Sequence, residues 1–140
     1  MDKEWPNLIG NNIDFWRHEW NTHGKCSEDN FDQFKYFNIT LAKKKEVDIL
    51  KYLEEADIKP NGASYESSNI SETIKKKKLY IPRLWCKNQT LLEISVCFNK
   101  LAKNKRNCPG SLLDYNESTK CKGKVSFPAK RKTIDEKDEL

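Results

Sequence analysis

The residues best suited to proton transfer lie in one stretch near the start of the chain, Phe15 to Cys26, which reads FWRHEWNTHGKC. It contains both histidines of the protein, His18 and His23, and Glu19 follows the first of them. Histidine gains and loses a proton near neutral pH, and a nearby carboxylate can orient it. The stretch therefore predicts an acid–base site, the alternative being that the two histidines are structural or merely exposed.

The spacing of these residues does not favour a metal site. His18 and His23 are five positions apart, whereas the zinc motif H-E-x-x-H places its histidines four apart on one helical face. The cysteines contain no C-x-x-C pair of the kind that holds structural zinc. They are Cys26, Cys86, Cys97, Cys108 and Cys121. We therefore expect no metal and no cofactor, and a disulfide framework that leaves one thiol over.

A helix is expected to carry the two histidines. Proline disfavours helix at the residue before it, so Trp5-Pro6 is predicted to be extended or turned. The helix is predicted to begin near Ile13 and to stop at Gly24. Three residues could cap its start, namely Asn11, Asn12 or Asp14.

The geometry of an α-helix decides which of these side chains share a face, because each residue adds about 100°. Glu19 and His23 form an i, i+4 pair on one face. His18 lies about 100° from Glu19 and about 140° from His23, so all three fit on one side of the helix.

The middle of the chain predicts further helical structure. Residues 27–37, which are rich in aromatic side chains, are expected to form a packed turn or a short helix. Lys43 to Lys45 form a lysine-rich step into a clearer helix, predicted by apolar residues at helical spacing over 47–56. That helix is expected to end at Pro60-Asn61-Gly62.

The second half predicts a short helix followed by strands. The helix is expected to open at Ser68 or Asn69 and to close on Lys75 to Lys78, where cations suit its negative end. Two strands, 80–87 and 90–100, are expected around Asn88-Gln89, and Val125 to Phe127 is expected to form an edge strand. Apolar residues recur in the second strand with a period of two, at Leu92, Ile94, Val96 and Phe98.

Length and composition indicate one domain without a membrane span. The chain has 140 residues, 34% of them charged, and a net charge of +5 with a pI near 8.9. The basic character favours a polyanionic partner such as nucleic acid. We expect one domain over residues 1–128 and a charged, disordered tail over 129–140.

Several features indicate a history in the secretory pathway. Besides the cysteines, the chain carries four N-x-S/T glycosylation sequons, at Asn38, Asn69, Asn88 and Asn116. No signal peptide is visible. The last four residues, Lys137 to Leu140, spell an endoplasmic-reticulum retention signal that would act only in a translocated chain, the alternative being the accidental end of a charged tail.

The stretch FWRHEWNTHGKC strongly resembles the second active-site motif of the ribonuclease T2 family, F-W-x-H-E-W-x-K-H-G-x-C. Trp5-Pro6, Ile81-Pro82 and the segment Leu92-Glu93-Ile94 through Cys97-Phe98 resemble the family too. The resemblance covers about residues 1–128, and the basic charge is most similar to plant S-RNases of self-incompatibility.

The resemblance implies a fold, a reaction and roles for the residues. The fold would be α+β, an antiparallel sheet with packed helices. The activity would be metal-independent cleavage of single-stranded RNA through a 2′,3′-cyclic phosphate. His23 would be the general base or acid, and His18 with Glu19 would stabilise the negatively charged phosphorane. Trp16 and Lys25 would contact substrate, since aromatic rings stack bases and lysines follow the backbone.

Two departures from the family pattern bear on activity. The family's earlier motif, H-G-L-W-P, supplies the second histidine of the acid–base pair, and no such string occurs in this chain. Thr22 stands where the family usually has a lysine. Lys25, about 60° away on a regular helix, could partly replace that lysine.

The resemblance also implies the cysteine pairing. Cys86 would pair with Cys121 and Cys97 with Cys108, while Cys26 would be left without the upstream partner that family members have. The leftover thiol, the absent first motif and the absent signal peptide share one explanation, that the N-terminal third of the protein is missing from this sequence.

Three hypotheses follow. The first is a T2-type endoribonuclease that acts as a monomer on single-stranded RNA, is secreted, and has a protein partner if it is of the self-incompatibility type. The second is an inactive relative that binds RNA or a protein through its basic surface, for which Lys75 to Lys78 are candidates. The third is a fold without a function.

Overall fold

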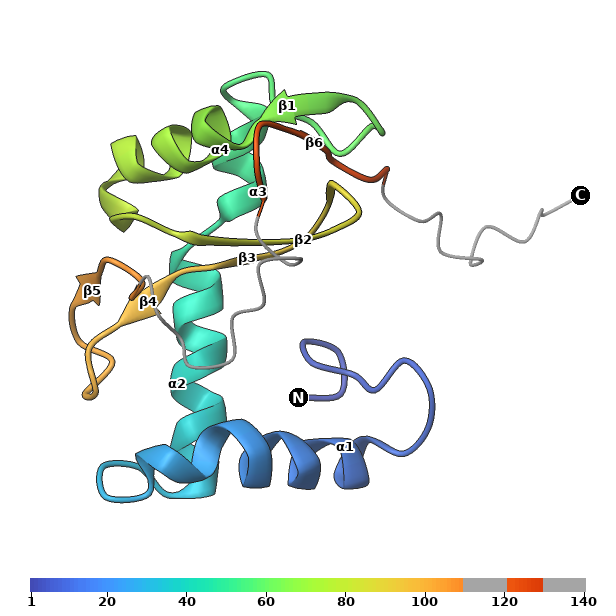
Figure 1. Ribbon diagram of the computed structural model, residues 1–140. Helices are drawn as coiled ribbons and strands as arrows, with labels where there is room; N and C mark the ends of the chain where they lie inside the picture. Colours follow the sequence, from blue (N-terminus) through green and yellow to red (C-terminus); the bar gives the residue numbers. More distant parts are fainter. Residues whose placement is uncertain (110–120, 130–140) are drawn as a thin grey trace, which may run out of the picture. The chain divides into compact units, whose positions relative to one another are not determined.

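The computed structural model describes residues 1–109 and 121–129, and its contacts divide the chain into two compact units. The first unit comprises Met1–Asp48 and Asn99–Asn104 (Figure 1). The second comprises Ile49–Phe98 and, of the described residues that follow, 105–109 and 121–129. The helices and the mixed sheet give the α+β class that the sequence predicts.

The first unit is helical. Its elements are α1 (Asn12–Glu19), the π-helix η1 (Trp20–Gly24), the 3-10 helix η2 (Lys25–Ser27) and α2 (Gln33–Glu46). The predicted helix through the histidine motif is confirmed, and Asn11 is its cap: its side chain accepts hydrogen bonds from the backbone N–H groups of Ile13 and Asp14.

Helix α2 is longer than predicted, because the expected aromatic turn and lysine-rich step form one 14-residue helix. Asp32 caps its start by accepting a hydrogen bond from the Lys35 N–H at 2.8 Å. Phe37 is 3% exposed and anchors the helix in the core of this unit. Lys43 to Lys45 form its last turn, where cations complement the helix dipole.

The second unit contains the remaining helices, α3 (Ile49–Glu54), α4 (Ser67–Ile74) and the π-helix η3 (Lys75–Leu79). Helix α3 is shorter than predicted, since the chain leaves helical geometry at Val47. Helix α4 confirms the predicted helix, with Ile70 and Ile74 fully buried on one face. It packs against α3 and also contacts the sheet (Figure 1).

The main sheet has the strand order β1-β6-β3-β2. Its strands are β1 (Ser64–Glu66), β2 (Arg83–Lys87), β3 (Thr90–Ser95) and β6 (Lys124–Ser126), and a second, two-stranded sheet joins β4 (Cys97–Phe98) to β5 (Lys105–Arg106). The prediction that 125–127 forms an edge strand is wrong. Strand β6 lies between β1, to which it is antiparallel, and β3, to which it is parallel.

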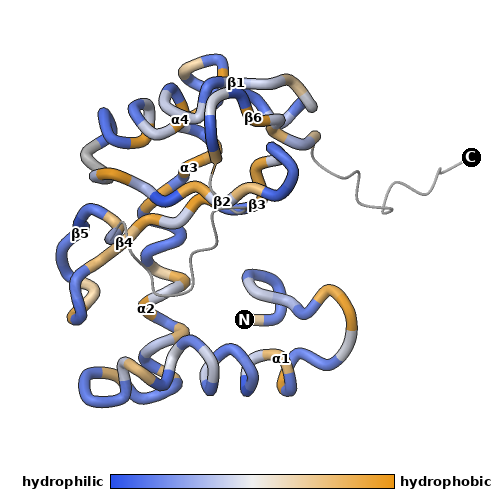
Figure 2. Tube along the Cα trace, in the orientation of Figure 1, coloured by the Kyte–Doolittle hydropathy of each residue, from blue (hydrophilic) through white to orange (hydrophobic). Residues whose placement is uncertain are grey.

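The predicted hairpin around Asn88-Gln89 is confirmed, because β2 and β3 pair antiparallel. Its period-two pattern is interrupted. The register shifts between Trp85 and Cys86, which leaves Leu92 as an extra residue in β3. As a result Leu91 is 5% exposed and Leu92 is 64% exposed. Figure 2 shows hydrophobic residues along β2 and β3, whereas α1 and the turn after it are mostly hydrophilic.

Two disulfides tie the second unit together, and they are the pairs that the family resemblance implies. Cys86 in β2 is joined to Cys121, three residues before β6, and Cys97 in β4 is joined to Cys108. Among the described residues, no helix is long and apolar enough to cross a membrane. The predicted tail, apart from Ala129, lies outside the described residues, as does Asn116.

Replacing Ile70 by alanine tests the core of the second unit. Ile70 is 0% exposed, so removing its side chain should leave a cavity and lower the free energy of unfolding by about 2–5 kcal/mol. Leu92→Ala, at the exposed bulge, should change it by less than about 0.5 kcal/mol. Urea denaturation followed by circular dichroism measures both, and equal losses in the two variants would contradict this description of the core.

Candidate active site

The histidine motif lies on a helix that packs against the first unit with one face and exposes polar side chains on the other. Trp16 and Trp20, four residues apart, are half-buried, and the Trp16 indole N–H donates a hydrogen bond to the Trp5 carbonyl at 2.8 Å. His18 follows Trp16 by two residues and so lies about 200° away, on the opposite side of the helix. His18 and His23 are both exposed, and Glu19 is half-buried. The tryptophans anchor the helix and leave the histidines accessible.

A row of aromatic rings fixes this helix to the rest of the first unit. The Trp5 and Phe37 rings meet edge to face at 5.3 Å, as do Phe37 and Tyr36, and Tyr36 meets Trp20 at 5.6 Å. Edge-to-face pairs at such distances contribute about 0.5–1.5 kcal/mol each beyond the burial of their area. The row joins the N-terminal segment, α2 and η1, so the histidine-bearing helix is held from its inner side.

The helix is not regular through the motif, and this alters the predicted geometry. Residues Trp20–Gly24 form a π-helix, in which the Lys25 N–H bonds to the carbonyl five residues back, at Trp20. A turn closed by an i→i+5 bond contains one residue more than an α-turn. The angle of about 140° expected between His18 and His23 therefore becomes smaller. The π-turn brings the two histidines closer to a common face.

Gly24, in η1, leaves room for the rings of Trp20 and Tyr36 because it has no side chain. It is buried, and a Cβ atom built on it would lie 2.5 Å from the Trp20 Cε3 atom and 3.2 Å from the Tyr36 Cδ1 atom. A side chain at this position would displace one of the two rings. Ser27 donates a hydrogen bond from its hydroxyl to the Gly24 carbonyl at 2.6 Å, which secures the end of the π-turn.

Tyr36 is a site neighbour that sequence reasoning did not single out, although it lay in the predicted aromatic cluster. Burial raises the pKa of its phenol, and the nearby negative charges of Glu19 and Cys26 raise it further. The carboxylate of the motif is thus close enough to Tyr36 to affect its titration.

The other predicted site residues are distributed around this helix. Trp16 uses its indole N–H within the fold, so only its half-exposed ring is available to a ligand. Lys25 is exposed but lies in the 3-10 turn η2, after the π-turn that contains Thr22. The angle of about 60° between them, which assumes a regular helix, is therefore wrong. Cys26 has an exposed, free thiol.

Three of the four predicted glycosylation sequons lie in the described part of the chain. Asn38 is exposed on α2 and Asn69 is exposed on α4. Asn88 is exposed in the turn between β2 and β3, where its φ of 49° is a left-handed conformation that asparagine tolerates. Each side chain is accessible to solvent.

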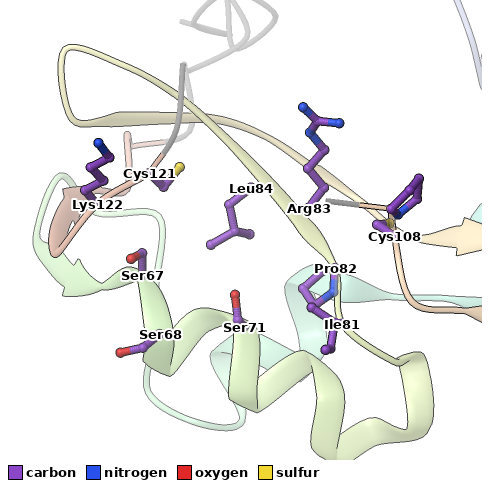
Figure 3. A pocket seen from close by; sticks show the side chains of 11 residues that line it. Ser67, Ser68, Ser71, Ile81, Pro82, Arg83, Leu84, Cys108, Cys121 and Lys122 are labelled. Atoms are coloured by element: carbon purple, nitrogen blue, oxygen red, sulfur yellow. The ribbon is translucent and has the colours of Figure 1, made fainter. Parts of the chain in front are cut away.

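A pocket in the second unit contains none of the motif residues. It encloses about 420 Å³ and is lined by α4, β2 and the segments that follow Tyr80 and precede β6. Figure 3 shows the Ser71 hydroxyl directed toward Leu84, whereas Arg83 points away from Leu84; the Arg83 guanidinium lies 4.2 Å from the centroid of the Trp85 ring. Its described lining includes no histidine and no carboxylate.

Comparisons with known proteins agree with the motif. The model of the Ribonuclease T2 family matches residues 1–108. Ribonuclease 3 of Arabidopsis thaliana is 33% identical over 136 residues, which cover 91% of this chain and 59% of that protein. Ribonuclease S-7 of Nicotiana alata is 37% identical over 116 residues, which cover 76% of this chain and 53% of that protein. The chain thus spans less than two thirds of the length of these relatives.

A solved structure extends the likeness to three dimensions. Ribonuclease MC1 from bitter gourd seeds superposes with a TM-score of 0.71 at 30% identity, over 77% of this chain and 60% of its own. A variant of ribonuclease MC1 has been solved in complex with 5′-UMP.

Replacing Gly24 by alanine separates two opposing effects. Alanine favours helix over glycine by about 1 kcal/mol, so a helix without the ring contacts would be stabilised. In the folded protein, however, the alanine side chain should clash with Trp20 and Tyr36, and this clash should lower the free energy of unfolding by about 1–3 kcal/mol. Asn21→Ala, at an exposed position in the same π-turn, is the control. Denaturation monitored by tryptophan fluorescence decides, and stabilisation by Gly24→Ala would contradict the contact.

Replacing Tyr36 by phenylalanine tests the environment of its hydroxyl. In the unfolded chain the phenol ionises near its ordinary pKa of 10.0, and in the folded chain at a higher pH. The raised pKa therefore contributes to the free energy of unfolding of the wild-type protein below pH 10, and this stabilisation is lost as the pH rises toward the folded pKa. Tyr36→Phe should lose less stability than wild type as the pH rises above 10, measured by thermal melting. Parallel losses in the two proteins would contradict the raised pKa.

Proposed function

Because the chain belongs to the ribonuclease T2 family, we propose that it cleaves single-stranded RNA as a T2-type endoribonuclease. In this reaction the 2′-hydroxyl gives up its proton and attacks the adjacent phosphorus. The bond to the 5′-oxygen breaks, that oxygen takes a proton, and a 2′,3′-cyclic phosphate forms that water later opens. No metal is needed for these steps, because side chains can transfer both protons.

The exposed face of α1 and η1 supports this assignment and is the observation that carries it. We assign His23 as the general base or acid, since histidine is the side chain most often used for proton transfer and this one is exposed, so that a substrate can reach it. We assign His18 and Glu19 to the phosphorane, whose negative charge a fixed imidazolium or a protonated carboxyl can stabilise. The π-turn supports a shared role, because it brings His18 and His23 toward one face.

Substrate binding would use two further residues of the motif, of which Trp16 lies on the side of the helix opposite His18. We assign Trp16, through its half-exposed ring, to stacking against an unstacked base, and Lys25 to a backbone phosphate. The complex of the ribonuclease MC1 variant with 5′-UMP supports a nucleotide as the ligand. The net charge of +5 also favours a polyanion.

The wider biological proposals rest on the sequence and on the relatives' names. We propose residues 1–128 as one T2-type domain, secreted and glycosylated at the sequons, and monomeric. The similarity to Ribonuclease S-7 supports an S-RNase-like role in self-incompatibility, which would add a protein partner. Retention in the endoplasmic reticulum through Lys137 to Leu140 would require that the chain be translocated.

One observation favours a second candidate function, an inactive relative that binds RNA or a protein. In-line transfer needs one group to remove a proton and another to deliver one, and this chain has two histidines, both in one motif. If His18 serves the phosphorane, His23 has no histidine partner within this sequence. Thr22 also stands where a lysine assists in the family.

Replacing His23 by alanine distinguishes the two functions. In an active enzyme the loss of the acid or base should lower kcat by about 10²–10⁴-fold on a single-stranded oligoribonucleotide. Lys87→Ala, an exposed position in β2, should leave kcat unchanged, and circular dichroism should show that both variants fold. RNA binding by the wild-type chain without cleavage would reject the enzyme and favour the inactive relative.

A further inference from the structure

A second hollow in the first unit has the composition of a nucleic-acid surface. It encloses about 620 Å³ between helix α2 and the loop Asn99–Asn104. Its lining combines apolar side chains, among them Ile39 and Leu101, with Lys35, Lys43 and Lys103. Its described lining includes no carboxylate, so the charge that the groove presents is positive.

The loop on one side of this groove is held in a definite shape. The Asn99 side-chain oxygen accepts hydrogen bonds from the N–H groups of Lys103 at 2.9 Å and Asn104 at 3.2 Å, and the Asn99 N–H donates to the Asn104 carbonyl at 2.8 Å. Ala102 has a φ of 53°, a left-handed conformation that a non-glycine residue adopts at a cost. These hydrogen bonds of Asn99 close the loop into a turn that carries Leu101 and Lys103.

The other side combines an aromatic ring with cations. The Lys35 ammonium lies 5.4 Å from the centroid of the half-buried Phe31 ring. The Lys43 ammonium also lines the groove but is paired with Glu46 at 2.7 Å, so part of its charge is already compensated. Aromatic rings and lysines along one groove are the features by which proteins hold single strands, the rings for bases and the cations for phosphates.

We propose that this groove is an additional binding subsite for single-stranded RNA, occupied by substrate nucleotides beyond those at the histidine face. Lys35 and Lys103 contact phosphates, and Phe31 contacts a base. The inference rests on the proposed function, since it names a further contact of the same substrate. Groove and histidines belong to one compact unit, and Asn30 and Phe31 follow His23 by only seven and eight residues. A strand long enough can therefore engage both.

The test is a comparison of two double variants that each lose two positive charges. Lys35→Ala with Lys103→Ala removes the proposed phosphate contacts, and Lys87→Ala with Lys124→Ala removes two exposed lysines of the second unit. The probe is a fluorescent RNA of about twelve nucleotides, a length within the range of single-strand binding sites. Its 2′-hydroxyls are methylated, so it lacks the nucleophile and binding is read without cleavage.

The groove variant should bind this RNA about five- to tenfold more weakly than wild type in low salt by fluorescence anisotropy, and the control variant less than about twofold. The slope of log K against log salt should fall by about 1.4 in the groove variant, since each phosphate contact to a single strand contributes about 0.7. A 2′-O-methylated dinucleotide, which fills the histidine face alone, should bind both variants and wild type equally.

Three results would overturn the proposal. One is unchanged affinity of the groove variant for the long RNA, and another is an equal loss in the control variant. The third is a pair of results: the groove variant binds polyglutamate more weakly than wild type, but it binds RNA as tightly as wild type. That outcome would assign the groove to an acidic protein. Failure of the proposed function is seen separately, as absent cleavage of unmodified RNA. Lysine-dependent binding in that case still supports the groove as an RNA site of an inactive relative.

Discussion

The contact of the Trp20 ring with Gly24 and Tyr36 is the constraint on which the arrangement of the first unit depends. A Cβ on residue 24 would lie 2.5 Å from the Trp20 ring, so the ring occupies the space that a side chain at this position would need. The tryptophan must in turn face the helix α2, which supplies Tyr36. Once this contact is made, the side of the helix that faces solvent is decided, and so is the exposure of His18 and His23.

The same contact gives the aromatic residues of the histidine motif a structural role. Helix α1 is short and contains no buried residue. Such a helix has little stability by itself. Trp16 and Trp20 provide the missing attachment, one through a hydrogen bond to Trp5 and the other through ring packing. Rigid attachment of one face positions polar side chains on the other, which is the requirement of a site that must stabilise charge.

The second unit contributes framework of a different kind. Its sheet is small, and two disulfides supplement a core formed by residues such as Leu53, Ile74 and Val125. Cross-links of this type raise stability by restricting the unfolded chain. The loop Asn99–Asn104 lies in sequence between β4 and β5 of this unit, yet its contacts are with the first. Through this loop, residues far from the histidines in sequence line a groove on the histidine-bearing unit.

The sequence by itself determined the features that local chemistry sets. It predicts a capping residue at Asn11, Asn12 or Asp14 because such side chains reach the first free N–H groups, and the structure selects Asn11. Ile70 and Ile74 recur at helical spacing, and Asn88-Gln89 suits a hairpin turn. The motif FWRHEWNTHGKC likewise identified the family and the candidate residues without any coordinates.

The tertiary structure decided what depends on contacts between distant residues. No local pattern places β6 between β1 and β3. A strand of three residues carries too little pattern to specify its neighbours, so its pairing depends on the rest of the fold. The extra residue Leu92 reverses which leucine is buried, because a register shift depends on the partner strand. The π-turn at Trp20–Gly24 is decided in the same way. No local pattern predicts it, and its first residue, Trp20, packs against a tyrosine sixteen positions later in the sequence.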